Sequence, residues 1–338
     1  MLTVSSILAS LANRGRLVPT GHLGQTGRFQ TSFNNPSGLI EMVKSFIPPL
    51  TYQSHKGESG RVGIVGGSQE YTGAPYFAAI SSLKLGADLS HVFCTKEAAP
   101  VIKSYSPELI VHPLLDDDNS STEITQWLPR LHSLVIGPGL GRNDTVINNT
   151  CRIIEQAKEY NIPLVIDADG LYLVTENPSI ISGYEKCVLT PNVVEFERLY
   201  KKVIGESPLL SEPVVCTKNL SQKMGHVTIV QKGVNDIITD GNRVLVCCNE
   251  GSPRRCGGQG DLLSGSVGTF LHWANKMFEN TDICNNSMLS YGPTISAAYA
   301  GCLLTRECNR RAFSKYQRSM TTSDMISSIQ ESFDFLYG

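Results

Sequence analysis

Short runs of apolar residues, each bounded by glycine, proline or aspartate, recur along the chain from about Gly60 onward. Runs of this kind are typical of strands that are covered on both faces of a sheet. They predict strands over Arg61–Val65, Leu89–Cys94, Leu109–Val111, Ser133–Ile136, Pro163–Ile166, Val227–Gln231, Asp236–Thr239 and Arg243–Cys248. Asp240-Gly241, between the last two runs, indicates a hairpin.

Helical patterns lie between these runs and dominate the last third of the chain. They predict helices over Ala74–Leu85, Thr145–Tyr160, Val193–Lys202, Asp261–Trp273, Ile295–Arg310 and Thr322–Phe335. This alternation, with no internal repeat or low-complexity linker, predicts a single α/β domain with one doubly wound, mostly parallel sheet flanked by helices. Ligands of such sheets bind at the carboxyl ends of the strands, so the chemistry is expected just after the apolar runs.

The first forty residues differ in kind from the rest. They contain Arg14, Arg16 and Arg28 but no Asp or Glu, and they are rich in Ser, Thr and Gly. This composition is typical of an organellar transit peptide, with the mitochondrion as the predicted destination. The alternatives are a plastid, or a disordered extension of a cytoplasmic protein. We therefore expect residues 1–40 to form a leader outside the fold.

The composition excludes several classes of partner. Only 18% of the residues are charged and the net charge is -2 at pH 7, so we expect no nucleic-acid partner and no anionic membrane partner. No apolar stretch approaches the roughly 20 residues of a membrane helix. The ten cysteines include no Cys-x-x-Cys pair and no zinc spacing, which predicts free thiols in a reducing compartment. The P-loop motif and a true dinucleotide-binding fingerprint are missing, which argues against a P-loop enzyme and a nicotinamide dehydrogenase.

The most informative segment is Gly251–Leu263, GSPRRCGGQGDLL, where three glycines stand beside one aspartate at the start of a predicted helix. Consecutive glycines allow backbone N–H groups to turn inward as an anion-binding nest, and the helix dipole adds partial positive charge. Asp261 would take a proton from a substrate hydroxyl while the nest holds the phosphoryl group being attacked. The alternative is that Asp261 is an ordinary N-cap after a tight loop.

Two further motifs follow predicted strands. Gly137–Gly141 (GPGLG) ends one strand, and glycine there permits close backbone approach to a ligand. Asp167 and Asp169 stand on alternate positions after another strand. These carboxylates would either hold a Mg²⁺ ion through water or cap the helix that follows.

The segments after the next strands carry polar groups as well. Pro191 is predicted at the opening position of a helix, where its missing N–H costs nothing. Asn192 and Glu195 then stand one turn apart. Gln231–Asp236 lies at a strand end and is predicted to be a turn that faces a nucleotide.

Seven motifs occur in one order: G-G-S…Y-T-G-A-P (66–75), S-P-E (106–108), G-P-G-L-G-R (137–142), D-A-D-G-L (167–171), L-T-P-N-x-x-E-F (189–196), K-G (232–233) and R-R-C-G-G-Q-G-D-L-L-S-G (254–265). Together they closely resemble the ATP-dependent (S)-NAD(P)H-hydrate dehydratases of the ribokinase-like superfamily. The resemblance spans about residues 45–336 and implies one ribokinase-like domain there. The glycine loop and the L-T-P-N-x-x-E-F stretch resemble the eukaryotic, ATP-using branch.

This resemblance implies a repair reaction. The family phosphorylates the 6-hydroxyl group of the S epimer of hydrated NADH or NADPH (NADHX, NADPHX) from ATP, and then eliminates phosphate to restore the ring double bond. Phosphorylation converts hydroxide, a poor leaving group, into a good one. The implied cofactors are ATP and Mg²⁺, which bridges the phosphates. An NAD(P)HX epimerase is the implied functional partner, and a homo-oligomer is left open.

The resemblance also assigns residues to roles. Asp261 is the implied base, and Gly258 and Gly260 belong to the implied anion hole. The implied ATP-binding residues are Lys232, Gly233, Val234, Asn235, Asp236, Gly251, Ser252, Pro253, Arg254, Arg255, Cys256, Gly257, Gly258, Gln259 and Gly260. The implied residues for the hydrated nucleotide are Gly139, Gly141, Asn192, Val193, Val194, Glu195, Phe196, Glu197, Arg198 and Asp261. Glu195 is the candidate Mg²⁺ ligand, directly or through water.

Two other functions use the same features. A ribokinase-like kinase of a vitamin-precursor alcohol would share the glycine loop and the aspartate but would release the phosphorylated product; it does not account for the remaining motifs in one chain. A nucleotide-binding protein that has lost catalysis would be damaged at the base or the anion hole, and both are intact here. Cys256 beside the loop either packs or makes the loop sensitive to oxidation.

Overall fold

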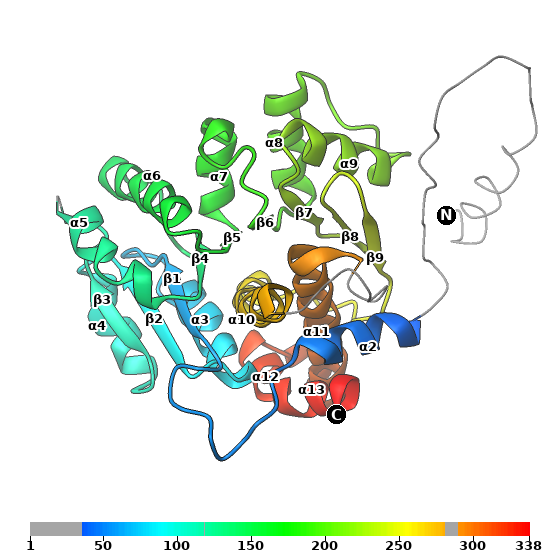
Figure 1. Cartoon of the computed structure of the whole chain (residues 1–338), viewed down its shortest axis with the longest axis horizontal. Coiled ribbons are helices and arrows are strands. Elements are labelled where there is room, and N and C mark those ends of the chain that lie inside the picture. The colour runs from blue at the N-terminus through cyan, green and yellow to red at the C-terminus, as the bar shows by residue number, and fades with distance from the viewer. Residues whose placement is uncertain (1–35, 118, 281–289) are drawn as a thin grey trace, which may run out of the picture. The chain divides into compact units, whose positions relative to one another are not determined.

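The computed structural model describes residues 36–117, 119–280 and 290–338, and it contains one nine-stranded sheet (Figure 1). The order across the sheet is β3-β2-β1-β4-β5-β6-β7-β8-β9. The strands are β1 (Arg61–Val65), β2 (Leu89–Cys94), β3 (Ile110–Pro113), β4 (Ser133–Ile136), β5 (Leu164–Ile166), β6 (Cys187–Leu189), β7 (Thr228–Gln231), β8 (Asp236–Thr239) and β9 (Val244–Cys247).

The sheet is parallel from β3 to β7, and only β8 and β9 run antiparallel to their neighbours. This confirms the predicted doubly wound, mostly parallel sheet and the β8–β9 hairpin. β1 pairs with β2 on one side and with β4 on the other, so the chain changes direction across the sheet at β1. Such a switch point leaves a crevice at the carboxyl ends of the two diverging strands.

Helices cover both faces of the sheet (Figure 1). They are α2 (Pro36–Phe46), α3 (Gly73–Leu85), α4 (Ala98–Tyr105), α5 (Ser120–Thr125), α6 (Asp144–Glu159), α7 (Asp169–Glu176), α8 (Val193–Ile204), α9 (Pro213–Lys223), α10 (Gln259–Asn280), α11 (Gly292–Tyr316), α12 (Thr322–Ser327) and α13 (Ile329–Tyr337). Successive strand residues contribute to different cores: Leu134 and Ile136 pack on one face, and Val135 packs on the other. This alternation follows from the two-residue period of a strand.

Helix α10 lies at the centre of one of these cores. Leu262, Val267, Phe270 and Leu271 are almost completely buried, and the helix packs on α3, α11, β4 and β5. Its amino end carries Asp261. The fold therefore fixes this aspartate through a helix that is itself held on several sides.

The predicted strands agree with the structure to within two residues, except that β6 was not predicted. Helices α10 and α11 extend well beyond the predicted Asp261–Trp273 and Ile295–Arg310, and α4, α5 and α9 were not predicted. The helix predicted over Thr322–Phe335 is two helices, which are separated at Ser328. Met325 of α12 and Leu336 of α13 both enter the core.

The folded part begins earlier than predicted. Residues 1–35 of the predicted leader lie outside the described residues, but α2 begins at Pro36. Leu39 and Ile40 pack against the core, and Val43 and Phe46 are buried in it. The boundary predicted at residue 40 is therefore wrong, because these apolar side chains recur at the spacing of one helix face.

Two histidines face each other between β2 and β3. His91 Nδ1 and His112 Nε2 are 3.0 Å apart, and the rings stack with centroids 5.3 Å apart. Burial lowers the pKa of each ring to about 4. Both rings are therefore neutral at pH 7, one as donor and the other as acceptor.

The free energy of unfolding is expected to fall as the pH drops from about 6.5 toward 4. In this range the unfolded histidines bind protons that the folded rings do not, so the unfolded state gains relative stability. Urea denaturation at pH 7, 6 and 5 measures the effect. The variant His112→Gln should show a shallower dependence on pH than the unaltered protein; an equally steep dependence would contradict the assignment to this pair.

Candidate active site

Polar groups from distant segments meet at the carboxyl ends of the central strands. The loops after β1, β4 and β5 lie side by side there, because Gly67 N–H donates to Gly139 O (3.1 Å) and Asp167 N–H donates to Ile136 O (3.0 Å). Gly137 has a φ of +120°, and a Cβ atom on it would lie 1.9 Å from Asp167 O. Only glycine allows this contact, so Gly137 serves the close packing of the two loops, and the predicted approach of this motif to a ligand stays a prediction.

The loop after β4 is held from the side of α7. Gly141 N–H donates to Asp169 Oδ2 (3.1 Å), and Arg142 Nε lies 3.3 Å from Asp169 Oδ1. These contacts hold Gly141 and Arg142, which follow the carboxyl end of β4, against the start of α7. Asp169 is the first residue of α7, whose N-cap is Ala168 without a side-chain cap. The predicted capping role of Asp167 and Asp169 is wrong, because their carboxylates bind other groups.

Lys232 pairs with Asp167 across the ends of β7 and β5. Their Nζ and Oδ1 atoms are 2.9 Å apart, and Asp167 is buried. Glu195 and Asp261 also lie within electrostatic range of the ammonium group. The site thus gathers three carboxyl groups around one lysine. The sequence placed Lys232 in an ATP-binding segment and gave no sign of its pairing with Asp167.

Asp261 is the third residue of α10, which begins at Gln259. The alternative of an ordinary N-cap is therefore wrong. Burial raises the pKa of this carboxyl group, and the neighbouring Asp167 raises it further against the opposing effect of Lys232, to about 7. A group with this pKa can both take up and release a proton near neutral pH.

The glycine loop leads directly into the first turn of α10. Gly258 has a φ of +92°, and a Cβ atom on it would lie 2.7 Å from the ring of Phe77, so this position requires glycine. Gly258 O accepts the helical hydrogen bond from Leu262 N–H (3.0 Å). The first N–H groups of a helix have no intrahelical acceptor. A Cβ atom on Gly260 would lie 3.5 Å from Lys232 Nζ, so the loop borders the ion pair.

The opening of α8 differs from the prediction in two respects. Pro191 lies before the N-cap, which is Asn192: its Oδ1 accepts from Val194 N–H and Glu195 N–H (2.9 and 3.0 Å). Glu195 Oε2 accepts from Asn192 N–H (2.7 Å) and closes a capping box. Phe196 was predicted to meet the substrate, but it is 1% exposed and its side chain packs in the core.

The turn after β7 is held by an arginine that the sequence did not reveal. Asp236 Oδ2 lies 2.7 Å from Arg306 Nε, and its Oδ1 accepts from Gly233 N–H (3.0 Å). Arg306 also donates to Gly233 O (3.1 Å). Asp236 was predicted to bind ATP, but its buried carboxylate is occupied and its role is to shape the turn. Arg306 lies on α11, and no motif connects it to this turn.

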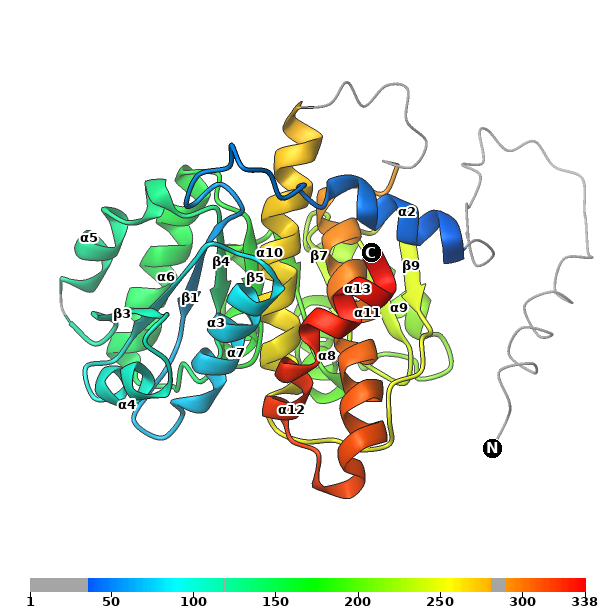
Figure 2. The same cartoon turned by 90° about the horizontal axis from the view of Figure 1, so that it is seen from below.

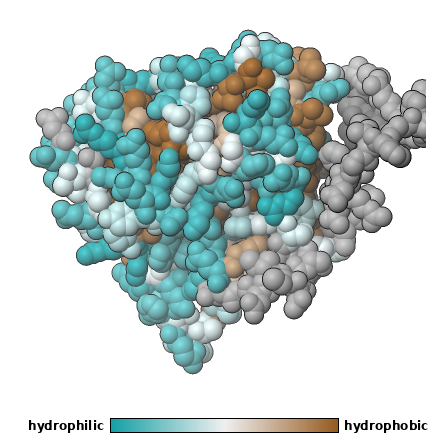
Figure 3. Space-filling view, turned by 45° about the horizontal axis from the view of Figure 1, so that its top comes forward, coloured by the Kyte–Doolittle hydropathy of each residue, from teal (hydrophilic) through white to brown (hydrophobic). Residues whose placement is uncertain are grey.

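Exposed valines border the same site. Val193 and Val194 open α8, and Val234 lies at the tip of the turn after β7 with 87% of its surface exposed. The two segments are adjacent because Lys232 N–H donates to Pro191 O (2.9 Å). Figure 3 shows that most of the surface on the α6–α9 side is polar and that apolar side chains gather in a few patches. The three valines therefore offer apolar surface beside the charged cluster.

The remaining predicted residues lie in or near these segments. Arg255 is exposed and donates to Ser252 O (2.7 Å), and Arg254 Nε donates to Met320 O (3.4 Å). Glu197 pairs with Lys201 on the surface of α8. Within residues 36–117, 119–280 and 290–338, no three His, Cys, Asp or Glu side chains are grouped so as to hold a metal ion.

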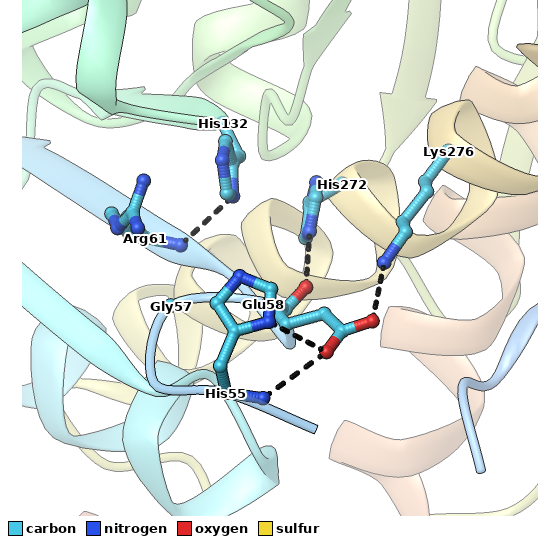
Figure 4. A pocket seen from close by; sticks show the side chains of 7 residues that line it. All are labelled: His55, Gly57, Glu58, Arg61, His132, His272 and Lys276. Carbon is cyan, nitrogen blue, oxygen red and sulfur yellow. Dashed lines mark hydrogen bonds and ion pairs between the residues drawn. The ribbon is translucent and has the colours of Figure 1, made fainter. Parts of the chain in front are cut away.

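A cavity of about 310 Å³ lies elsewhere, at the opposite ends of the strands (Figure 4). Arg61 begins β1 and His132 precedes β4, so the cavity is at their amino ends. Glu58 lies between His55 and Lys276, and His272 stacks on His132 with centroids 4.3 Å apart. Within the cavity, Glu58 is paired with His55 and Lys276. The predicted site residues lie instead at the carboxyl ends of the strands. We therefore do not assign the chemistry to this cavity.

Among the described residues, no helix is both long and apolar enough to cross a membrane. The nine cysteines that the structure describes are all free thiols, as predicted.

The sequence matches known proteins over most of its length. A model of the NAD(P)H-hydrate dehydratase family matches residues 62–331. The chain is 55% identical over 309 residues to the ATP-dependent (S)-NAD(P)H-hydrate dehydratase of Danio rerio, a match that covers 91% of this chain and 92% of that protein. It is 54% identical over 306 residues to the human protein of the same name, covering 90% and 86% of the two chains.

Solved structures share the fold at lower identity. A ribokinase-like superfamily protein of Enterococcus faecalis superposes with a TM-score of 0.72 at 21% identity, covering 88% of this chain and 94% of that one. The ADP/ATP-dependent NAD(P)H-hydrate dehydratase of Bacillus subtilis, co-crystallised with ATP and Mg²⁺, superposes with a TM-score of 0.63 at 18% identity, covering 87% and 97%. These likenesses confirm the ribokinase-like fold.

Proposed function

The chain belongs to the NAD(P)H-hydrate dehydratase family and is an ATP-dependent enzyme of that family, and on this premise we propose that Asp261 and the glycine loop carry its reaction. The observation that supports this most is the position of Asp261. It lies in the first turn of α10, next to the glycine loop, with a pKa of about 7. A base at a helix amino end suits proton transfer beside a phosphoryl group.

The first step is phosphoryl transfer. The carboxylate of Asp261 takes the proton of the 6-hydroxyl group as that oxygen bonds to the γ-phosphorus of ATP and the bond to ADP breaks. The N–H groups of residues 258–260 hold the phosphoryl oxygens in flight, since preorganised donors stabilise charge that develops in a transition state. Lys232, beside Gly260, adds a positive charge to the same region.

The second step is elimination. The lone pair of the neighbouring ring nitrogen expels phosphate from C6, and a proton leaves C5 as the ring double bond forms. The products are NADH or NADPH, ADP, phosphate and a proton. Val193, Val194 and Val234 offer the apolar surface against which the rings of the two nucleotides pack.

Magnesium fits the residues at this site. Mg²⁺ is usually held by one or two carboxylates together with substrate phosphates and water, rather than by a cage of protein ligands. Glu195 is suited to this, because only its Oε2 is used in the capping box. When bound, the ion would neutralise charge on the ATP phosphates.

Hydrated NADH mixed with the protein, ATP and Mg²⁺ is expected to regain the absorbance of reduced nicotinamide, with one ADP formed for each NADH recovered. Omission of ATP should stop the recovery, and ADP in place of ATP should not support it. If ATP is consumed and a phosphorylated hydrate accumulates, the protein acts as a kinase that releases the phosphorylated product. No recovery at all would contradict the proposed function.

A further inference from the structure

The glycine loop rests on a segment from near the other end of the chain. Thr322, the first residue of α12, donates its hydroxyl hydrogen to Gly257 O at 2.6 Å. Met320 O accepts from Arg254 Nε in the same contact. Figure 2 shows α12 beside the end of α10 where the glycine loop enters, and the two helices are in contact. The loop is thus supported by α12 as well as by its own helix.

The hydroxyl of Thr322 is buried and its hydrogen bonds have a defined direction. The residue is 2% exposed. A hydroxyl has one hydrogen, which goes to Gly257 O because a carbonyl can only accept. Cys256 Sγ lies 3.5 Å from the same oxygen, so the thiol must be the donor there. The thiol sulfur accepts in turn from Gln259 Nε2 (3.2 Å). Gln259, Cys256, Thr322 and Gly257 therefore form one directed chain.

This chain controls the orientation of a single peptide group. Gly257 C=O and Gly258 N–H belong to the same planar trans peptide and point in opposite directions. With the carbonyl held by Thr322, the N–H is directed away from α12. The peptide lies between two glycines, which tolerate the backbone angles of either orientation. Without the hydroxyl, little would prevent the peptide from turning over.

We propose that Thr322 is a positioning residue of the anion hole: its hydroxyl holds the Gly257–Gly258 peptide so that Gly258 N–H faces the phosphoryl group in transfer. The inference rests on the proposed function, in which this N–H is one of the donors. In this arrangement the Cys256 thiol donates to the Thr322 hydroxyl. Of the two alternatives for Cys256, this structural role favours packing over sensitivity to oxidation.

Two variants of nearly the same shape separate the hydroxyl from packing. Thr322→Val keeps the volume and loses the hydroxyl, whereas Thr322→Ser keeps the hydroxyl and loses a methyl group. The valine variant should lose about 10- to 100-fold in kcat, part of the ~10²–10³ that one such donor contributes, while KM for ATP changes less than about twofold. The serine variant should retain most of the activity.

Binding measurements give a second readout. ADP with aluminium fluoride mimics a phosphoryl group in transfer, so Thr322→Val should weaken its binding by about the same factor as kcat. Binding of ADP alone should be unchanged. Thr321→Val is the matched control, because the hydroxyl of that neighbour bonds to Asp324 and not to the loop; it should leave kcat intact.

Equal losses in the valine and serine variants would show that packing matters rather than the hydroxyl, and would overturn the inference. Full kcat in Thr322→Val would overturn it as well. If the unaltered protein fails to dehydrate the hydrate with ATP, the proposed function fails by itself. In that case the binding of ADP with aluminium fluoride still decides the role of Thr322.

Discussion

Asp261→Asn is expected to lower kcat by about 10²- to 10⁴-fold, the range that a positioned general base contributes. The amide has nearly the same shape but cannot accept the proton of the substrate hydroxyl. ATP should still bind, since the glycine loop and Lys232 are unchanged. Single-turnover recovery of NADH and a separate titration with ATP measure the two effects.

A buried carboxylate elsewhere provides the control. Asp240 lies in the β8–β9 hairpin, where it pairs with Arg243. Asp240→Asn is the same substitution at another buried aspartate, and it removes the ion pair with Arg243. It is expected to lower the free energy of unfolding and to leave turnover per folded molecule unchanged. Near-normal turnover by Asp261→Asn would rule out its role as the base.

Lys232→Met and Asp167→Asn are expected to shift the activity profile in opposite directions along the pH axis. Asp261 acts in its deprotonated form, so kcat should rise with pH through a pKa of about 7. Lys232 opposes the raised pKa and Asp167 adds to it. The methionine variant should therefore need a higher pH, and the asparagine variant a lower one. The measurement is kcat against pH at saturating ATP and hydrate.

Lys232→Met leaves the buried carboxylate of Asp167 without its partner, so the free energy of unfolding should fall by about 3–5 kcal/mol, as when one member of a buried pair is removed. Asp167→Asn should cost less, because Lys232 is 22% exposed and keeps Glu195 and Asp261 within electrostatic range. The double variant should lose less than the sum, because neither charge is then left alone. A purely structural pair would show these stability losses with no displacement of the pH profile, and that result would refute the electrostatic role.

Much of the fold follows from local pattern. The runs at Arg61–Val65, Leu89–Cys94 and Ser133–Ile136 coincide with β1, β2 and β4, because each is apolar on both faces and is bounded by residues that end a strand. β6 escaped prediction because Cys187–Leu189 is short and is flanked by Lys186 and Thr190, whereas the equally short β5 is bounded by Pro163 and Asp167. Helix α2 escaped because its first residues share the acid-poor composition of the segment before them.

The sequence identified which segments form the site, but it did not identify which of their residues contact one another. Asp261 and the glycine loop stood out because consecutive glycines before an acid at a helix start suit an anion-binding nest, although an ordinary N-cap has a similar pattern. The partners of these groups come from the order of strands and helices: Asp167 meets Lys232 because β5 and β7 flank β6, and Asp236 meets Arg306 from α11. Thr322 lies 66 positions from Cys256, and no local signal marks a threonine that supports a distant loop.

The position of Asp261 on α10 links catalysis to the resistance of the fold to heat. The residues that follow it, among them Leu262, Val267 and Phe270, are fully enclosed between the sheet, α3 and α11. Amide hydrogens in such a helix exchange with solvent only when the whole domain opens. Asp261 directly precedes this enclosed segment. We therefore expect the base to lose its position only when the core itself opens, so that thermal inactivation and global melting coincide.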